Sequence, residues 1–135
     1  YYLYKQLLSS RRNVYFFRGH NIADFMCEVE EGSVCVVMDF RRYANPNIKV
    51  AKHAKDMGAK LIAVTDSRFC ATALLADHQF TVATKSATMF ESYTAGLALV
   101  DVIMMTLINL NGGKFKERLD RMEDVYTAFG MFGPQ

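Results

Sequence analysis

The chain lacks the paired cysteines, clustered histidines and strong net charge that would indicate several common kinds of protein. Its three cysteines form no CxxC pair, so we expect reduced thiols of a cytoplasmic protein, with neither a disulfide framework nor a zinc site. The histidines His20, His53 and His78 are scattered without the spacing of metal ligands, and we expect no cofactor. The net charge of +2 is too small by itself to indicate a nucleic-acid-binding module.

The sequence also has no uninterrupted apolar run of the length that a membrane-spanning helix requires. The most apolar window covers residues 95–110 and is broken by Asp101, Thr106 and Asn109. A membrane span takes about 20 mostly apolar residues, so we expect a buried helix here and no membrane association. No signal peptide, repeat or linker is recognisable, and 135 residues with 51% hydrophobic content predict one globular domain.

What the sequence does contain is a closely spaced alternation of strands and helices. The continuous apolar run at residues 33–39 is typical of a parallel strand that is covered on both faces. Gly58 is expected to end one helix, and Asn111-Gly112-Gly113 to break another. This alternation predicts an α/β fold, a parallel sheet with helices on both faces. The expected strands are 13–17, 33–39, 60–65 and 78–82, and the expected helices are 1–9, 46–57, 71–76, 88–110 and 114–129.

The segment from Asp39 to Pro46 is the first candidate for a binding site. It follows the apolar run at 33–39, and ligands of open α/β sheets bind past the carboxyl ends of strands. Asn45 is the expected N-cap of the next helix, with Pro46 at its first position. The free N–H groups at that helix start would favour an anion, and Arg41 and Arg42 add two positive charges.

A longer pattern carries a family resemblance. Residues 51–67 read AKHAKDMGAKLIAVTDS, a helix followed by a strand that ends in Thr65-Asp66-Ser67. Leu75-Ala76-Asp77 follows before the next expected strand, and Ser86 and Phe90 precede or open the long helix. From about residue 1 to residue 129, this ordered set resembles the sugar isomerase (SIS) domain of RpiR-type bacterial transcriptional regulators.

The resemblance implies a fold, a function and partners. SIS domains of these regulators have a three-layer, flavodoxin-like parallel sheet of five strands, and they sense a sugar phosphate. By comparison, residues 1–135 would be a SIS domain that lacks the N-terminal helix-turn-helix domain and the first strand. We therefore expect a longer parent protein that binds DNA only through the missing domain, and a small-molecule sugar phosphate or sugar acid as its ligand.

The site departs from the family pattern at the loop after residues 33–39. In many SIS domains this loop reads roughly S-x-S-G-x-T and holds a phosphate, whereas this chain has Asp39, Arg41, Arg42 and Ala44 at those positions. A guanidinium could still bind a phosphate in a bidentate fork, although Asp39 would oppose an anion or pair with an arginine. Three interpretations stay open: structural salt bridges, an altered acid-binding site, or a degenerate pocket. Tyr43 could cover the ligand or simply pack.

Four more residues complete the predicted ligand site. Thr65, Asp66 and Ser67 follow a strand and could either cap the short turn after it or contact the ligand. Ser86 could cap the long helix and reach an anion from there.

Catalysis is not expected from the sequence. An isomerase needs a carboxylate or histidine base near its substrate, and residues 80–89, which lead into the long helix, contain none. Glu91 is expected just inside that helix, where it would stabilise the first turn.

The long helix is apolar on more than one side, with Ala95, Gly96 and Ala98 permitting close contact. Since SIS domains pair through helices, the resemblance implies a homodimer. The last helix could add to that contact or fold back on its own sheet.

Overall fold

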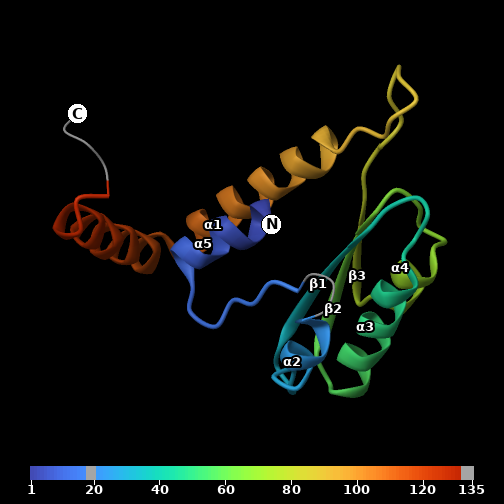
Figure 1. The fold of residues 1–135 in the computed structure, drawn as a ribbon, viewed down its shortest axis with the longest axis horizontal. Helices are drawn as coiled ribbons and strands as arrows, with labels where there is room; N and C mark the ends of the chain where they lie inside the picture. Colours follow the sequence, from blue (N-terminus) through green and yellow to red (C-terminus); the bar gives the residue numbers. More distant parts are fainter. Residues whose placement is uncertain (18–20, 132–135) are drawn as a thin grey trace. The chain divides into compact units, whose positions relative to one another are not determined.

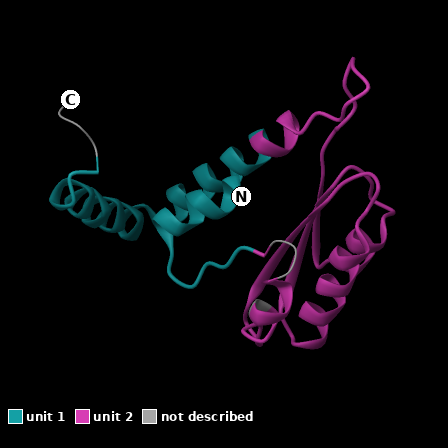
Figure 2. Ribbon diagram, viewed as in Figure 1, with its two compact units in different colours: residues 1–16, 98–135 teal, residues 17–97 magenta. Residues whose placement is uncertain are grey.

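A computed structural model of the protein describes residues 1–17 and 21–131. His20 therefore lies outside the described residues. The chain divides into two compact units (Figures 1 and 2). Unit 2 covers residues 17–97 and contains the sheet, and unit 1 combines residues 1–16 with residues 98–135.

The sheet of unit 2 has three parallel strands in the order β1-β2-β3. They are β1 (Val34–Asp39), β2 (Lys60–Thr65) and β3 (His78–Thr81). The register runs from Val34 opposite Lys60 to Asp39 opposite Thr65, so the carboxyl ends of β1 and β2 lie side by side. The connections contain α3 (Asn45–Asp56) and α4 (Ala71–Leu75), and α2 (Ile22–Met26) precedes β1. The predicted α/β class with a parallel sheet is confirmed.

Small residues let the helices of unit 2 lie close to the sheet. Ala51 and Ala54 of α3 are fully buried in one cluster with Cys35 and Val37 of β1 and Leu61 of β2. Gly58, at φ +78°, ends α3 in the left-handed conformation that glycine adopts without steric cost, as predicted. The chain then turns directly into β2, while hydrogen bonds from Ala44 and Asn47 to Asp39 hold the start of α3 beside the carboxyl end of β1.

The other side of β1 is open. Exposed and buried side chains alternate along this strand, and Val34, Val36 and Met38 remain exposed. The prediction of a strand covered on both faces is therefore wrong for the described residues, because the helices that pack on β1 in unit 2 bury only its alternate side chains.

The predicted strand at residues 13–17 is also wrong, since these residues have no regular secondary structure. A strand exists only when a neighbour completes its ladder of hydrogen bonds. The sheet of the described residues contains β1, β2 and β3 and does not include this segment.

Unit 1 is formed by α1 (Tyr2–Ser10) and by most of α5 (Thr94–Ala128). Leu3, Val100 and Met104 form its small buried cluster. The Tyr2 hydroxyl donates a hydrogen bond of 2.8 Å to the Asp101 carboxylate, and this links the two helices. The helical path breaks at Asn111 (φ −133°, ψ 25°), in agreement with the predicted interruption at Asn111-Gly112-Gly113.

α5 differs from the prediction in its start and in its burial. It begins at Thr94 and not at residue 88, and residues 86–90 form a separate turn. By length and composition α5 could cross a membrane, with a mean hydropathy of 1.6 over its most apolar window, but only 11% of that window is buried. Within the described chain most of this window is therefore exposed, and the predicted burial would have to come from a partner. Exposed apolar side chains on α5 include Leu97, Val102, Met105, Ile108, Leu110, Leu119 and Val125.

Candidate functional site

Asp39 is the last residue of β1 and connects three segments at the carboxyl edge of the sheet. Its side chain is almost fully buried, with 2% exposure. One carboxylate oxygen accepts hydrogen bonds from the Ala44 N–H (3.3 Å) and the Asn47 side-chain amide (2.8 Å), and the other accepts one from the Thr72 hydroxyl (2.6 Å). A buried carboxylate is stable only with such donors. A pairing of Asp39 with an arginine, one of the two alternatives that the sequence left open, is absent among the described ion pairs.

The start of α3 also differs from the prediction. Ala44 is the N-cap and has no side-chain cap bond, so Asn45 lies inside the helix and Pro46 occupies its second position. The carboxylate of Asp39 takes over the capping role by accepting the Ala44 N–H. This negative charge beside the helix start is favourable.

Arg41 and Arg42 occupy the turn between β1 and α3. The Tyr43 N–H donates to the Phe40 carbonyl at 2.9 Å and closes this turn. Arg42 lies at φ +79°, a conformation that suits glycine and costs another residue roughly 1–2 kcal/mol. The loop thus keeps a glycine-like backbone although it carries an arginine. Both arginines are exposed, and neither forms an ion pair within the part of the chain that the structure describes.

Tyr43 connects the first loop with the segment after β2. Its hydroxyl donates a 2.9 Å hydrogen bond to Asp66, whose other carboxylate oxygen accepts from Thr84 at 3.4 Å. Partial burial and the Asp66 carboxylate both raise the pKa of Tyr43, so the hydroxyl keeps its proton and remains a donor. Asp66 therefore joins three segments, one after each strand of the sheet.

Thr65 and Ser67 organise the turn before α4. Thr65 is fully buried, and its hydroxyl contacts the Cys70 sulfur at 3.2 Å and accepts the Ser67 N–H at 3.3 Å. The Ser67 hydroxyl accepts the Phe69 N–H at 3.3 Å, which is a turn-capping geometry. The side chain of Ser67 is half-buried and lies beside Asp66.

Ser86 does not cap the long helix. Its hydroxyl donates to the Phe90 carbonyl and accepts the Thr88 N–H, so it holds the turn at residues 86–90 together. The predicted cap is wrong because α5 begins at Thr94, eight residues later in the sequence.

The sequence interpretation missed the position of Glu91. This residue lies before α5 and not inside it, and its carboxylate accepts a 3.2 Å hydrogen bond from the Tyr93 hydroxyl. The Tyr93 ring packs against Phe40 of the first loop, with ring centroids 5.2 Å apart. The hydrogen bond to the Glu91 carboxylate raises the pKa of Tyr93, and the charges of Asp66 (raising) and Arg42 (lowering) act on it more weakly. A hydroxyl-rich start, Ser92 to Thr94, is the signal that could have placed the helix boundary.

These residues form an open, polar edge that could bind a small molecule. The exposed guanidinium groups of Arg41 and Arg42 suit an acidic group, while Asp66, Ser67 and Glu91 offer hydrogen bonds to hydroxyl groups. No group of three or more potential metal ligands occurs among the described residues.

The family of the chain is shown by its similarity to known proteins. A model of the SIS domain family matches residues 6–106. The chain belongs to the SIS domain family. The comparison with curated proteins gave no match.

Solved structures share the SIS fold of this chain. The sugar isomerase domain of an RpiR transcription factor from Sphaerobacter thermophilus is similar over 91% of this chain and 70% of its own, with 19% identity and a TM-score of 0.83. NanR of Vibrio vulnificus, solved with ManNAc-6P, is similar over 98% of this chain and 51% of its own (16% identity, TM-score 0.81). This chain thus spans about half of NanR. A presumed sugar-phosphate isomerase from Listeria monocytogenes is similar over 84% and 65%, respectively (19% identity, TM-score 0.64). At such identities the likeness shows the fold alone.

Proposed function

We propose that this SIS domain is the effector-sensing, dimerising part of a cytoplasmic transcriptional regulator, and that it binds a phosphosugar or a related acidic sugar. DNA would be bound by a separate domain of the longer protein. Support for this proposal comes from the two similar structures, an RpiR transcription factor and a NanR protein solved with ManNAc-6P.

The observation that carries the proposal is the backbone of Arg42. A non-glycine residue at φ +79° persists only where its surroundings hold it, and such residues gather at functional sites. Here it exposes two adjacent guanidinium groups without a carboxylate partner among the described residues. An acidic ligand would supply that partner.

We assign a role to each residue of the predicted site according to its exposure to solvent. Arg41, Arg42, Tyr43, Asp66 and Ser67 would contact the ligand. Asp39 and Thr65, with 2% and 0% exposure, would shape the loops from beneath, and Ser86 would hold the turn before α5.

A ligand panel tests the proposal. Thermal unfolding of the full-length protein should be measured with sugar phosphates, sugar acids and the matching neutral sugars. A ligand at a hundredfold excess over its Kd stabilises the folded state by about 2.7 kcal/mol. We expect a selective rise in Tm with one acidic compound and none with its neutral counterpart. A flat panel would contradict the sensor and would favour a dimerisation module with a degenerate pocket.

An isomerase is the second candidate, and the position of Glu91 favours it. A carboxylate that precedes α5 could act as a base on a bound sugar. We propose that it does not, because the Tyr93 hydroxyl already donates to it. Incubation of the best ligand with the protein, followed by product analysis, decides this point. Turnover by the native protein that disappears in Glu91→Gln would show that the protein is an enzyme and would contradict the sensor proposal.

A further inference from the structure

Unit 1 contains two neighbouring cavities that lie between the end of α1 and α5 and share Ser10, Arg12 and Lys114. The first has a volume of about 330 Å³, and the second of about 720 Å³. We call them together the basic groove. Such volumes are in the range of small-molecule sites.

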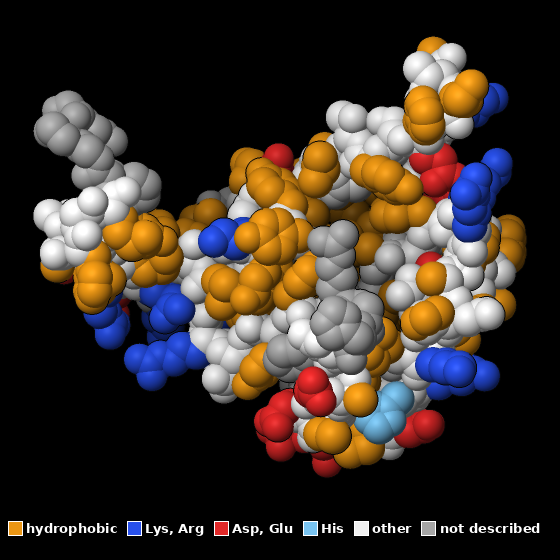
Figure 3. Space-filling view, in the orientation of Figure 1, with side chains coloured by type: hydrophobic (Ala, Val, Ile, Leu, Met, Phe, Trp, Pro, Cys, Tyr) orange, Lys and Arg blue, Asp and Glu red, His pale blue; other side chains and the backbone are white. Residues whose placement is uncertain are grey.

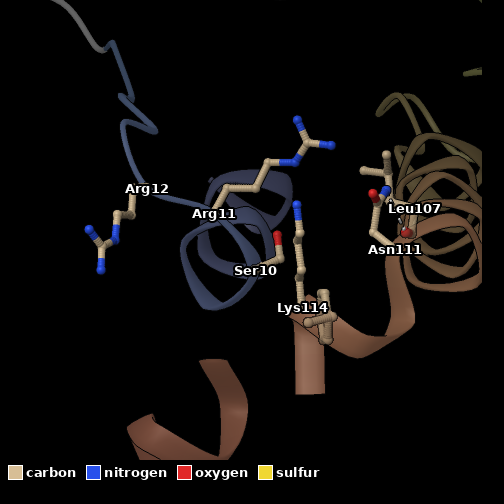
Figure 4. Close-up of a pocket in the computed structure, with 7 residues that line it drawn as sticks. Ser10, Arg11, Arg12, Leu107, Asn111 and Lys114 are labelled. Atoms are coloured by element: carbon tan, nitrogen blue, oxygen red, sulfur yellow. Dashed lines mark hydrogen bonds between the residues drawn. The ribbon is translucent and has the colours of Figure 1, made fainter. Parts of the chain in front are cut away.

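The basic groove is rich in cations that lack a carboxylate partner. Arg11, Arg12 and Lys114 line the first cavity, which has no acidic residue in its lining. Within the described residues none of these three side chains forms an ion pair. Figure 4 shows Arg11 and Lys114 extending toward one another from two different elements, while Arg12 points away from them. The cations would repel one another unless an anion lay between them.

The second cavity continues this charge. It is lined by Arg118 and Arg121, and its one acidic residue, Glu117, pairs with Arg121 at 3.8 Å. Arg118 donates two hydrogen bonds, of 3.1 and 2.9 Å, to the Leu8 carbonyl, which fixes the second half of α5 against α1. Figure 3 shows Lys and Arg side chains gathered beside this half of the helix.

Apolar side chains complete the lining. Leu107 and Phe115 lie at the first cavity, and Met122 and Val125 at the second. The Ser10 hydroxyl donates to the Leu7 carbonyl at 2.9 Å, and the Asn111 amide donates one N–H to the Leu107 carbonyl at 3.3 Å, which leaves its second N–H as a donor for an anion. The groove therefore combines an exposed cationic rim with an apolar wall.

From this arrangement we propose that the basic groove of unit 1 is a second ligand site, for a small molecule with two or more phosphate groups. Guanidinium groups bind phosphate in a bidentate fork, and lysine adds a point charge. Two or more anionic groups match cations that come from the segment directly after α1 and from α5. All lining residues of this site belong to unit 1, and the proposal does not depend on the proposed function.

Inorganic tripolyphosphate is the probe, and binding is measured by calorimetry on the full-length protein at constant ionic strength. The protein carries Arg41→Ala and Arg42→Ala throughout, so that the loops of unit 2 do not contribute. We expect saturable binding that weakens at least tenfold when Arg11→Ala and Lys114→Ala are added. The matched pair Lys49→Ala and Lys52→Ala also removes two exposed cations, but from α3, and should leave the affinity unchanged.

Two single variants give a second test. Lys114→Arg keeps the positive charge, so its affinity for tripolyphosphate should stay within about threefold of the starting protein. Lys114→Gln removes the charge, so its affinity should fall by more than that. Circular dichroism confirms that each variant is folded. Absence of saturable binding, equal loss in both double variants, or binding of duplex DNA without any binding of tripolyphosphate would each overturn the proposal. The last result would identify the groove as a nucleic-acid contact.

Discussion

Asp39 holds three segments of the candidate site together with one carboxylate. In Asp39→Ala, the buried Thr72 hydroxyl and the part-buried donors of Ala44 and Asn47 lose their acceptor. We expect a loss of at least about 2 kcal/mol in the free energy of unfolding, because unsatisfied buried donors are costly. Asp39→Asn is the matched control, since its amide oxygen can still accept, and it should lose roughly half as much. Urea denaturation measures both, and a neutral Asp39→Ala would contradict the role given to this carboxylate.

Asp77 predicts a pH dependence of stability. Its carboxylate accepts the Leu61 N–H at 2.8 Å and pairs with Lys55 at 2.7 Å, and these contacts lower its pKa from 3.8 to about 2. A depressed pKa in the folded state adds stability that is present above the unfolded value and is lost as the pH falls through the folded value. The stability difference between the native protein and Asp77→Asn should therefore shrink between about pH 4 and about pH 2. Urea midpoints across this range measure it, and a constant difference would refute the assignment.

At the scale of elements, the ends of helices account for the clearest stability predictions. Gly58 lies at φ +78°, so Gly58→Ala should destabilise by about 1 kcal/mol although a new Cβ would meet only ordinary contacts with Glu31. Gly112 lies in α5 with open space around it, so Gly112→Ala should stabilise by about 0.5–1 kcal/mol. Thermal unfolding of the two variants should move in opposite directions. Equal shifts in Tm would mean that backbone conformation does not determine the effect of alanine on stability at these two positions.

Elements with a strong local signal could be predicted from sequence. β2 matches its predicted bounds, Lys60–Thr65, because a buried apolar run is flanked by Gly58 and by the polar Asp66-Ser67. The break at Asn111 is likewise encoded locally. Residues 13–17 have the composition of a strand, but a strand depends on a neighbour that local sequence cannot supply.

The site was predicted less well than the fold because its contacts join distant residues. Asp39 and Thr72 lie 33 positions apart, so nothing near Asp39 in the sequence reveals that its charge is already satisfied. Because α5 starts at Thr94, both Ser86 and Glu91 lie before this helix and not at its first turn. A small shift in one helix boundary thus changed the roles of two residues.

At the scale of the whole molecule, the exposed apolar side chains of α5 bear on the proposed homodimer. Met105 is 63% exposed on a helix that should be covered if a second copy packs there. We expect Met105→Glu to convert a dimer into a folded monomer, as measured by analytical ultracentrifugation with circular dichroism. Lys116→Glu, an exposed position on the second half of α5, is the control for an added acid. A native protein that is monomeric would contradict the homodimer.

The most direct test of the central claim is the affinity of the selected acidic ligand for Arg41→Ala and for Arg42→Ala, measured by calorimetry on the full-length protein. Lys52→Ala removes an exposed cation from the middle of α3 and serves as the control. We predict that each arginine variant binds at least tenfold more weakly, about 1.4 kcal/mol, while the control is unchanged. Unchanged affinity in both arginine variants would show that the loop after β1 is not the ligand site.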